Sequence, residues 1–359
     1  MAYIPATSHV TLLATLRRER LLPLAGDVIV EARQRLEASD VVARTYLAEH
    51  HKLVDIARKL GLPPDKADSA LLKKDGDPVK AGEPIAQRKV LLGLVPRSAR
   101  SPVEGRLVAA AGGKALVAAI SRPYELRAGV PGTVVSILQS RGVVIETTGA
   151  LVEGVWGNGQ QDFAPLRLAG KDPNGSLTAA DVDMNMRGAL VVAGSVTEAA
   201  TLKRLADVPV RGLVVGSMPA SLQAAAQKLS LPVLVVESFG QGGFSEPVLA
   251  LLSTNAGRDA WLNAVTRDRF LGRRPELIIP LPGAATPPPA VTDGAALAVG
   301  KRVRVLRGPE AGRVGTLAAL GERPVSLPSG LRARTASVVF GDSASPPVRV
   351  AYANLELLE

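Results

Sequence analysis

Five basic side chains lie close together near the C-terminus of this 359-residue chain, in a segment that largely alternates apolar and charged positions. Val303 and Val305 supply the apolar positions, so the pattern predicts a half-buried strand with one wet, basic face. Guanidinium and ammonium groups along such a face can contact phosphate oxygens or an acidic protein surface. The candidate contact residues are Lys301, Arg302, Arg304, Arg307 and Arg313.

The same segment contains the residues that would position these cations in a tight connection between two strands. Gly308 and Pro309 end the first predicted strand, and a second strand begins at Arg313. Glycine permits positive φ angles and close approach of two backbones, which a short connection needs. The candidate turn residues are Gly308, Pro309, Gly312 and Gly315.

Residues 299–317 read VGKRVRVLRGPEAGRVGTL, and this segment resembles a KOW motif. KOW motifs are the strand–loop–strand units of the transcription factor NusG and of several large-subunit ribosomal proteins. The resemblance implies that residues 297–359 form a small SH3-like barrel that binds RNA, the ribosome or RNA polymerase. The whole chain resembles uncharacterised bacterial KOW-domain proteins.

Residues 297–359 contain nine Lys and Arg against five Asp and Glu, a net charge of +4. Aromatic residues make up only 3% of the chain, so base stacking is not expected to dominate. We therefore expect phosphate-driven contact with a steep dependence on salt. Residues 267–296 read as one strand followed by a stiff proline-rich linker, which would isolate this final module.

Residues 1–122 contain a weak internal repeat, in which two similar strand–turn–strand units are followed by a hairpin near residues 101–113. The pattern resembles a barrel-sandwich hybrid, the fold of biotinyl and lipoyl carrier domains. Lys89 is the nearest match to the carriers' modified lysine, but the flanking Met or Asp is missing. We expect a scaffold and no attached cofactor. Residues 53–64 have partial helix-turn-helix spacing, against which we weigh a short helix that bridges two β units.

Residues 123–185 predict a further β-rich module, and residues 186–266 change character. There, apolar runs at 188–193, 212–215 and 232–237 alternate with helical segments, which predicts a small parallel α/β sheet. Ligands on such sheets bind beyond the carboxyl ends of the strands. The candidate anion-site residues there are Gly216, Ser217, Gly240, Gly242 and Gly243. The alternative is that these residues only form turns and caps.

Other functional classes find little support in the sequence. The chain has no cysteine, and its three histidines, His9, His50 and His51, form no evident metal-ligand set. No catalytic residue, metal site or cofactor is predicted. No apolar run is long enough to span a membrane, so we expect a cytoplasmic protein without a membrane partner.

The net charge of +10 favours a polyanionic partner, although a compositional bias of the genome would give the same excess. We expect a multi-domain, non-enzymatic protein with all-β and α/β parts that binds nucleic acid or a ribonucleoprotein in transcription or translation. One alternative is an enzyme or ligand sensor with an anion site in residues 187–265. Another is a structural β-rich scaffold that self-assembles into oligomers.

Overall fold

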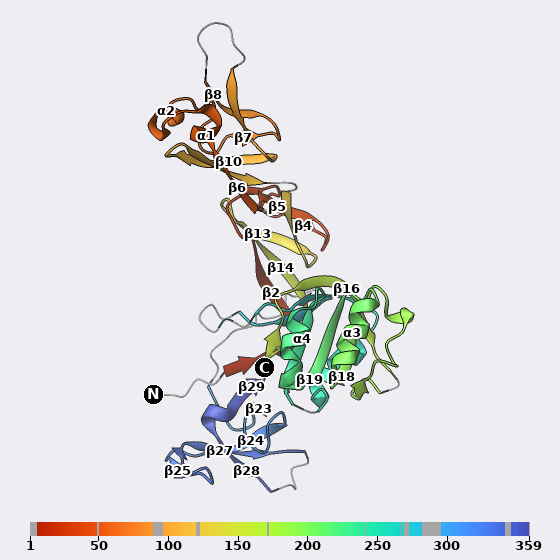
Figure 1. Cartoon of the computed structure of the whole chain (residues 1–359). Helices are drawn as coiled ribbons and strands as arrows, with labels where there is room; N and C mark the ends of the chain where they lie inside the picture. Colours follow the sequence, from red (N-terminus) through yellow and green to blue (C-terminus); the bar gives the residue numbers. More distant parts are fainter. Residues whose placement is uncertain are drawn as a thin grey trace.

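The computed structural model describes residues 6–48, 50–88, 96–119, 123–170, 172–240, 242–266, 268, 273–281, 296–341 and 346–358. Strands dominate these residues, as the sequence predicts, and the helices lie in two places, around residues 56–68 and beside the large central sheet (Figure 1). The molecule is elongated (Figure 1). Along its length lie an upper lobe within residues 50–119, a middle lobe around residues 27–46 and 123–127, a central α/β part around residues 190–239 and a C-terminal unit around residues 302–358.

One sheet runs through the centre of the protein and joins distant parts of the chain. Its strand order is β15-β20-β19-β18-β16-β21-β22-β14-β13-β4, with β17 beside β18 and β2 beside β14. Its twelve strands are β2 (Val10–Leu21), β4 (Arg35–Leu36), β13 (Gly132–Leu138), β14 (Gly142–Glu153), β15 (Trp156–Gly157), β16 (Gln161–Leu168), β17 (Ser176–Leu177), β18 (Leu190–Val196), β19 (Gly212–Met218), β20 (Val233–Phe239), β21 (Asp259–Asn263) and β22 (Glu276–Pro280).

The parallel strands β18, β19 and β20 form the α/β part, where β18 and β19 are buried at every position. Leu202 and Leu205 of one helix lie in the core on one face, and Val248 and Leu251 of another lie in the core on the opposite face. Burial on both faces explains the continuous apolar runs of these strands. The helices are α3 (Ala199–Asp207), α4 (Gln223–Gln227) and α5 (Glu246–Thr254), with short 3-10 turns η1 (Met184–Met186) and η2 (Ala220–Leu222).

The middle lobe combines a small three-stranded sheet with the end of the large one. The small sheet contains β3 (Asp27–Val28), β5 (Val41–Tyr46) and β12 (Pro123–Arg127). Strand β2 pairs with β14 along most of its length, so residues 10–21 belong with residues 142–153. Residues 1–122 therefore do not form one self-contained domain. Strands β2, β4 and β5 share a core with β12, β13 and β14, which follow residue 122.

The upper lobe is built from residues 50–119 and has its own apolar core around Ile56, Leu60 and Leu107. Helices α1 and α2 have five residues each, and α1 buries Ile56 and Leu60 in that core. Two short packed helices fit the bridging interpretation better than a DNA-reading helix-turn-helix. Lys89 lies outside the described residues. The elements are β6 (His50–Asp55), α1 (Ile56–Leu60), α2 (Pro64–Asp68), β7 (Pro78–Val79), β8 (Pro84–Arg88), β9 (Arg97–Arg100), β10 (Gly105–Ala111) and β11 (Lys114–Ala119).

The C-terminal unit is a six-stranded sheet with the order β1-β29-β23-β24-β27-β28. A separate two-stranded pair, β25 (Val325–Ser326) with β26 (Arg332–Ala333), extends from it. The strands of the sheet are β1 (Ala6–Ser8), β23 (Arg302–Val305), β24 (Val314–Leu320), β27 (Thr335–Val339), β28 (Val348–Ala351) and β29 (Leu355–Leu358), with the 3-10 turn η3 (Tyr352–Asn354) before β29. Strands expected on either side of Gly308 are thus confirmed. The predicted linker at residues 282–290 lies outside the described residues.

No helix in the described ranges combines the length and the apolar character that crossing a membrane requires.

Candidate functional site

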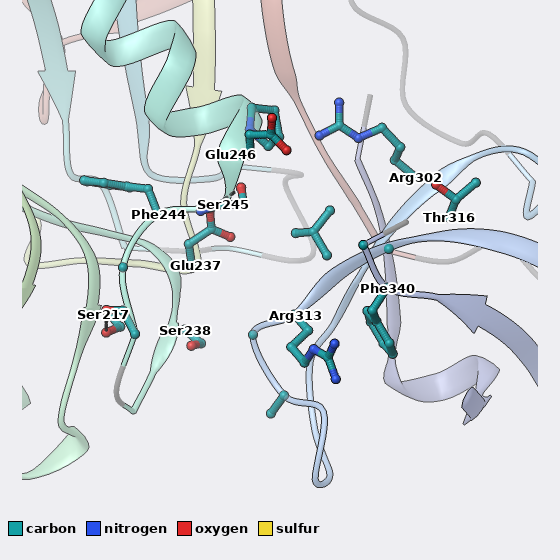
Figure 2. Close-up of a pocket in the computed structure, with 18 of the residues that line it drawn as sticks. Ser217, Glu237, Ser238, Phe244, Ser245, Glu246, Arg302, Arg313, Thr316 and Phe340 are labelled. Atoms are coloured by element: carbon teal, nitrogen blue, oxygen red, sulfur yellow. Dashed lines mark hydrogen bonds between the residues drawn. The ribbon is translucent and has the colours of Figure 1, made fainter. Parts of the chain in front are cut away.

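A cleft of about 710 Å³ lies where the C-terminal unit meets the α/β part. One wall comes from the carboxyl ends of β19 and β20, the loop after β20 and the beginning of α5. Strands β24 and β27 and the turn before β24 supply the other wall. Figure 2 shows Ser217, Glu237 and Ser245 on the α/β side, with Arg302 and Phe340 on the C-terminal side.

The cleft brings together residues from two candidate sites that the sequence places far apart. From the candidate anion site come Ser217, Gly242 and Gly243, and from the basic segment come Arg302 and Arg313. The turn residues Gly312 and Gly315 also line the cleft, whereas Lys301, Arg307, Gly216 and Gly240 do not. Carboxyl ends of parallel strands are a common place for ligands, and here they face cations from another unit.

The turn before β24 has the geometry that the sequence predicts. Gly308 and Gly312 have φ angles of 101° and 85°, which favour glycine. A Cβ atom on Gly312 would lie 3.2 Å from Oγ of Ser238, so this turn packs against the end of β20. A Cβ on Gly315 would lie 2.5 Å from the carbonyl oxygen of Val339, so the close strand approach there requires glycine.

Arg304 does not belong to the exposed basic face that the sequence predicts. Its side chain is 1% exposed, and its Nη1 donates to Oε2 of Glu237 at 2.7 Å. Its Nε donates to Oε2 of Glu356 at 3.0 Å, and Nη1 also donates to the carbonyl oxygen of Val236. A guanidinium enclosed by two carboxylates is not available to phosphate. Strand alternation could not reveal this, because the α/β part covers the strand face that the pattern predicts to be wet.

Arg304 belongs to a buried ion-pair network that joins three parts of the protein. Nη1 of Arg274 donates to Oε1 of Glu356 at 2.9 Å and to Oγ of Ser8 at 2.8 Å. Arg274 also lies 3.8 Å from Glu153 of β14. The network connects β1, β14, β20, β23 and β29, so the C-terminal unit is fastened to the α/β part. The expectation that residues 297–359 are isolated from the rest of the chain is therefore wrong.

Glu356 and Arg304 stabilise each other in their charged forms. Burial raises the pKa of Glu356, but attraction to Arg304 and bonds from Arg274 outweigh burial and lower that pKa to about 2. Burial lowers the pKa of Arg304, but Glu356 and Glu237 outweigh it and raise that pKa above its usual value. The pKa of Glu153 is raised, chiefly by burial, despite the bond from the His9 backbone and the charge of Arg274.

Several donors in and beside the loop after β20 are already used in internal hydrogen bonds. Backbone N–H of Phe244 donates to Oδ1 of Asn174, and Ser245 donates from both N and Oγ to Oε1 of Glu237. Oγ of Ser217 donates to the carbonyl oxygen of Gly242. These donors are therefore not free to cradle an anion, and Glu237 would repel one were it not paired with Arg304. The anion site expected at Gly216, Ser217, Gly240, Gly242 and Gly243 stays a prediction, with the hydroxyl of Ser217 already engaged.

The remaining basic residues of the segment keep exposed side chains. Lys301, Arg302 and Arg307 are exposed, as is Arg313, which pairs with Glu310 and lies with its Cζ 4.2 Å above the ring of Phe340. The ring orients the Arg313 guanidinium along the cleft wall. Sequence reasoning missed Phe340, Glu237 and Glu356, because their roles depend on contacts between units.

The described residues contain no group of three or more His, Asp or Glu side chains that could hold a metal ion. No protein-family model matches the chain, and no curated protein matches its sequence. The geometry of the cleft and the charges around it therefore carry the functional argument.

Proposed function

We propose that this chain is a non-enzymatic protein that binds RNA or a ribonucleoprotein through the basic face of its C-terminal unit. The observation that carries the proposal is the placement of Arg302 and Arg313 on one wall of the cleft, with Lys301 and Arg307 exposed on the same unit. The phosphates of a nucleic acid would neutralise these cations and release counterions.

The strand order of the C-terminal unit supports a KOW-type SH3-like barrel. Strands β23, β24, β27 and β28 pair in sequence order, and β29 returns to pair with β23 after the 3-10 turn η3. A meander whose last strand pairs with its first is the arrangement that such a barrel needs. For the upper lobe, the sheet β6-β11-β10-β7 with the β8–β9 pair is compatible with a barrel-sandwich scaffold.

The arrangement of the cleft favours a chain-like ligand over a small one. Its cations come from the C-terminal unit, and Lys301 and Arg307 lie outside it. An extended phosphate backbone can contact several separated guanidinium groups at once, whereas a small anion cannot. We therefore expect single-stranded RNA to pass along the cleft wall, with Phe340 and Arg313 forming one stacking surface for a base.

The test uses the full chain, a short fluorescein-labelled single-stranded RNA and anisotropy at about 50 and 200 mM salt. Replacing Arg302, Arg307 and Arg313 together by Gln should reduce affinity at least about tenfold and lower the salt slope by about 2 to 3. The control replaces the exposed Arg167, Arg204 and Arg258 of the α/β part by Gln, with the same loss of charge.

Equal weakening by both triple variants would mean that net charge alone drives binding, and this result would contradict the proposed face. Absence of binding by the unmodified chain at low salt would contradict it as well. Affinity purification from native lysate, with and without nuclease, then separates partners. Ribosomal or polymerase subunits that resist nuclease would point to a ribonucleoprotein machine, whereas loss of all partners after nuclease would point to RNA itself.

A further inference from the structure

Arg20 is a buried cation that forms no ion pair with any carboxylate of the described residues. Its side chain belongs to β2, and the residue is only 7% exposed. No carboxylate of the described residues lies within ion-pair distance of it. Its Nε and Nη2 donate to the carbonyl oxygen of Arg127, and Nη1 donates to Oε1 of Gln161 at 2.7 Å. A guanidinium has five N–H groups, so two donors remain.

Trp261 and Gly129 complete the surroundings of this guanidinium. Cζ of Arg20 lies 4.9 Å from the centre of the Trp261 ring. Gly129 has a φ of 79°, and a Cβ atom there would lie 2.9 Å from Nε1 of Trp261 and 3.3 Å from Nη2 of Arg20. The indole N–H group and the guanidinium therefore both pack closely against Gly129. Glycine at this position allows the two donors to lie side by side against the backbone.

These groups line a cleft of about 560 Å³ between the middle lobe and the α/β part. Two further arginines, Arg127 and Arg211, lie on its walls, together with the rings of Tyr124 and Phe163. Arg211 pairs with Asp162, and Arg127 lies 3.8 Å from Glu125, so these two carboxylates lie beside the arginines of the walls. Among the described residues no carboxylate pairs with the buried Arg20 in the same way.

The pKa of Arg20 reflects this buried position. Burial lowers its pKa to about 10, although Tyr124 and the charge of Glu276 oppose that change. An unpaired buried charge is costly, and uncharged acceptors such as Gln161 and a carbonyl oxygen offset only part of that cost. A bound anion would supply the missing partner.

We propose that this cleft binds a small ligand that carries one anionic group, a phosphate or a carboxylate, and a planar ring. The anion pairs with the inner guanidinium of Arg20 and accepts from Trp261 Nε1, and Arg211 and Arg127 contact it from the walls. The ring lies between the apolar surfaces of Tyr124 and Phe163. The site is separate from the cleft at the C-terminal unit, and its existence does not depend on RNA binding.

Tryptophan fluorescence provides a direct test, because Trp261 lies against the proposed anion. The chain has two tryptophans, and Trp156→Phe leaves Trp261 as the single reporter. Adenosine monophosphate, phenyl phosphate and benzoate are each titrated into this variant. Each should give a saturable change in Trp261 fluorescence. Inorganic phosphate and adenosine, which carry only the charge or only the ring, should bind at least about tenfold more weakly than the best of these.

Variants then assign the contacts. In the Trp156→Phe background, Arg20→Met should weaken binding of the best probe about ten- to a hundredfold, because it removes the charged donors. Arg211→Gln changes an exposed wall residue and should weaken binding about threefold or more. Arg167→Gln, an exposed arginine that lines neither cleft, should leave affinity unchanged.

Two outcomes would overturn the site: no saturable response of the folded Trp156→Phe protein to any of the three ring-bearing anions, or equal affinity in the Arg20→Met and Arg167→Gln variants. If Arg20→Met fails to fold, Arg211→Gln decides by the same criterion. A preference for phenyl phosphate over benzoate identifies a phosphoryl ligand, and the reverse identifies a carboxylate. A response to adenosine monophosphate alone identifies a nucleotide.

Discussion

Nη1 of Arg304 lies 2.7 Å from Oε2 of Glu237, although the two residues belong to different units of the protein. The guanidinium of β23 also contacts Glu356 of β29, so one cation is shared by the C-terminal unit and the parallel sheet. Both carboxylates are almost fully buried. This ion pair fixes the cleft wall relative to the strand ends that face it.

Replacing Arg304 by Leu should lower the free energy of unfolding by about 3 to 5 kcal/mol, because Glu237 would keep a buried charge without an ion-pair partner and Glu356 would keep only Arg274. Urea denaturation measures the change. Arg302→Leu, two residues earlier on the same strand but exposed, should change it by less than about 0.5 kcal/mol. Similar values for the two variants would contradict the role of the buried pair.

Stability should fall in acid because of Glu356. Its pKa in the folded protein is lowered from 4.5 to about 2, so its contribution is complete above pH 4.5 and is lost as pH falls towards 2. The contribution is on the order of 3 kcal/mol. Glu356→Gln should be less stable than the unmodified chain at pH 7, and this difference should shrink as pH falls through that window.

Glu153 should act in the opposite sense, since its pKa is raised. Protonation of Glu153 favours the folded state, so Glu153→Gln should cost least, or even stabilise, near neutral pH. Thermal unfolding of both Gln variants between pH 7 and about 3 tests the pair of expectations. Parallel curves for the two variants and the unmodified chain would show that neither carboxyl group contributes as described.

Asn158 should be important for the stability of the α/β part. Its Nδ2 donates to the carbonyl oxygen of Leu231 at 2.9 Å, and its Oδ1 accepts from the backbone N–H of Val233 at 3.0 Å. Asn158→Ala should cost about 2 to 4 kcal/mol, because buried backbone groups lose their partners. Asn185→Ala, which changes an exposed amide, should cost little in the same denaturation experiment.

Gly315 and Gly308 should respond differently to a methyl group. At Gly315 the new Cβ would meet the Val339 carbonyl at 2.5 Å and Cδ1 of Phe340 at 2.8 Å, so β24 and β27 would have to separate. We expect Gly315→Ala to cost more than about 2 kcal/mol. Gly308 has open space around it, so Gly308→Ala should cost only about 1 kcal/mol through its φ of 101°. Equal unfolding midpoints for the two variants would contradict this distinction.

Local patterns predict the elements of the α/β part well. The runs at 188–193 and 212–215 lie within or beside β18 and β19, because strands buried on both faces are apolar at every position. The turn glycines of the C-terminal unit were equally predictable, since positive φ angles restrict residue type. These features depend on neighbours in the sequence.

Long-range pairings could not be predicted in the same way. Strand β2 pairs with β14, although the residues of the upper lobe lie between them in the sequence. Nothing in the sequence of either segment identifies the other as its partner. The burial of Arg304 has the same origin, because alternation shows which residues share a strand face but not what covers that face. The cleft and the Arg20 site are both formed by residues far apart in sequence, so only the folded chain reveals them.

Strands β1 and β29 run parallel and pair through Thr7 and Leu357, which lie far apart in the sequence. During synthesis, β1 must therefore wait for its partner until residues 355–358 have left the ribosome. A chain that stops before β29 would leave the hydrogen-bonding edge of β1 open and would lack Glu356 beside Arg274 and Arg304. The order of translation thus makes this pairing a late step in the folding of these residues.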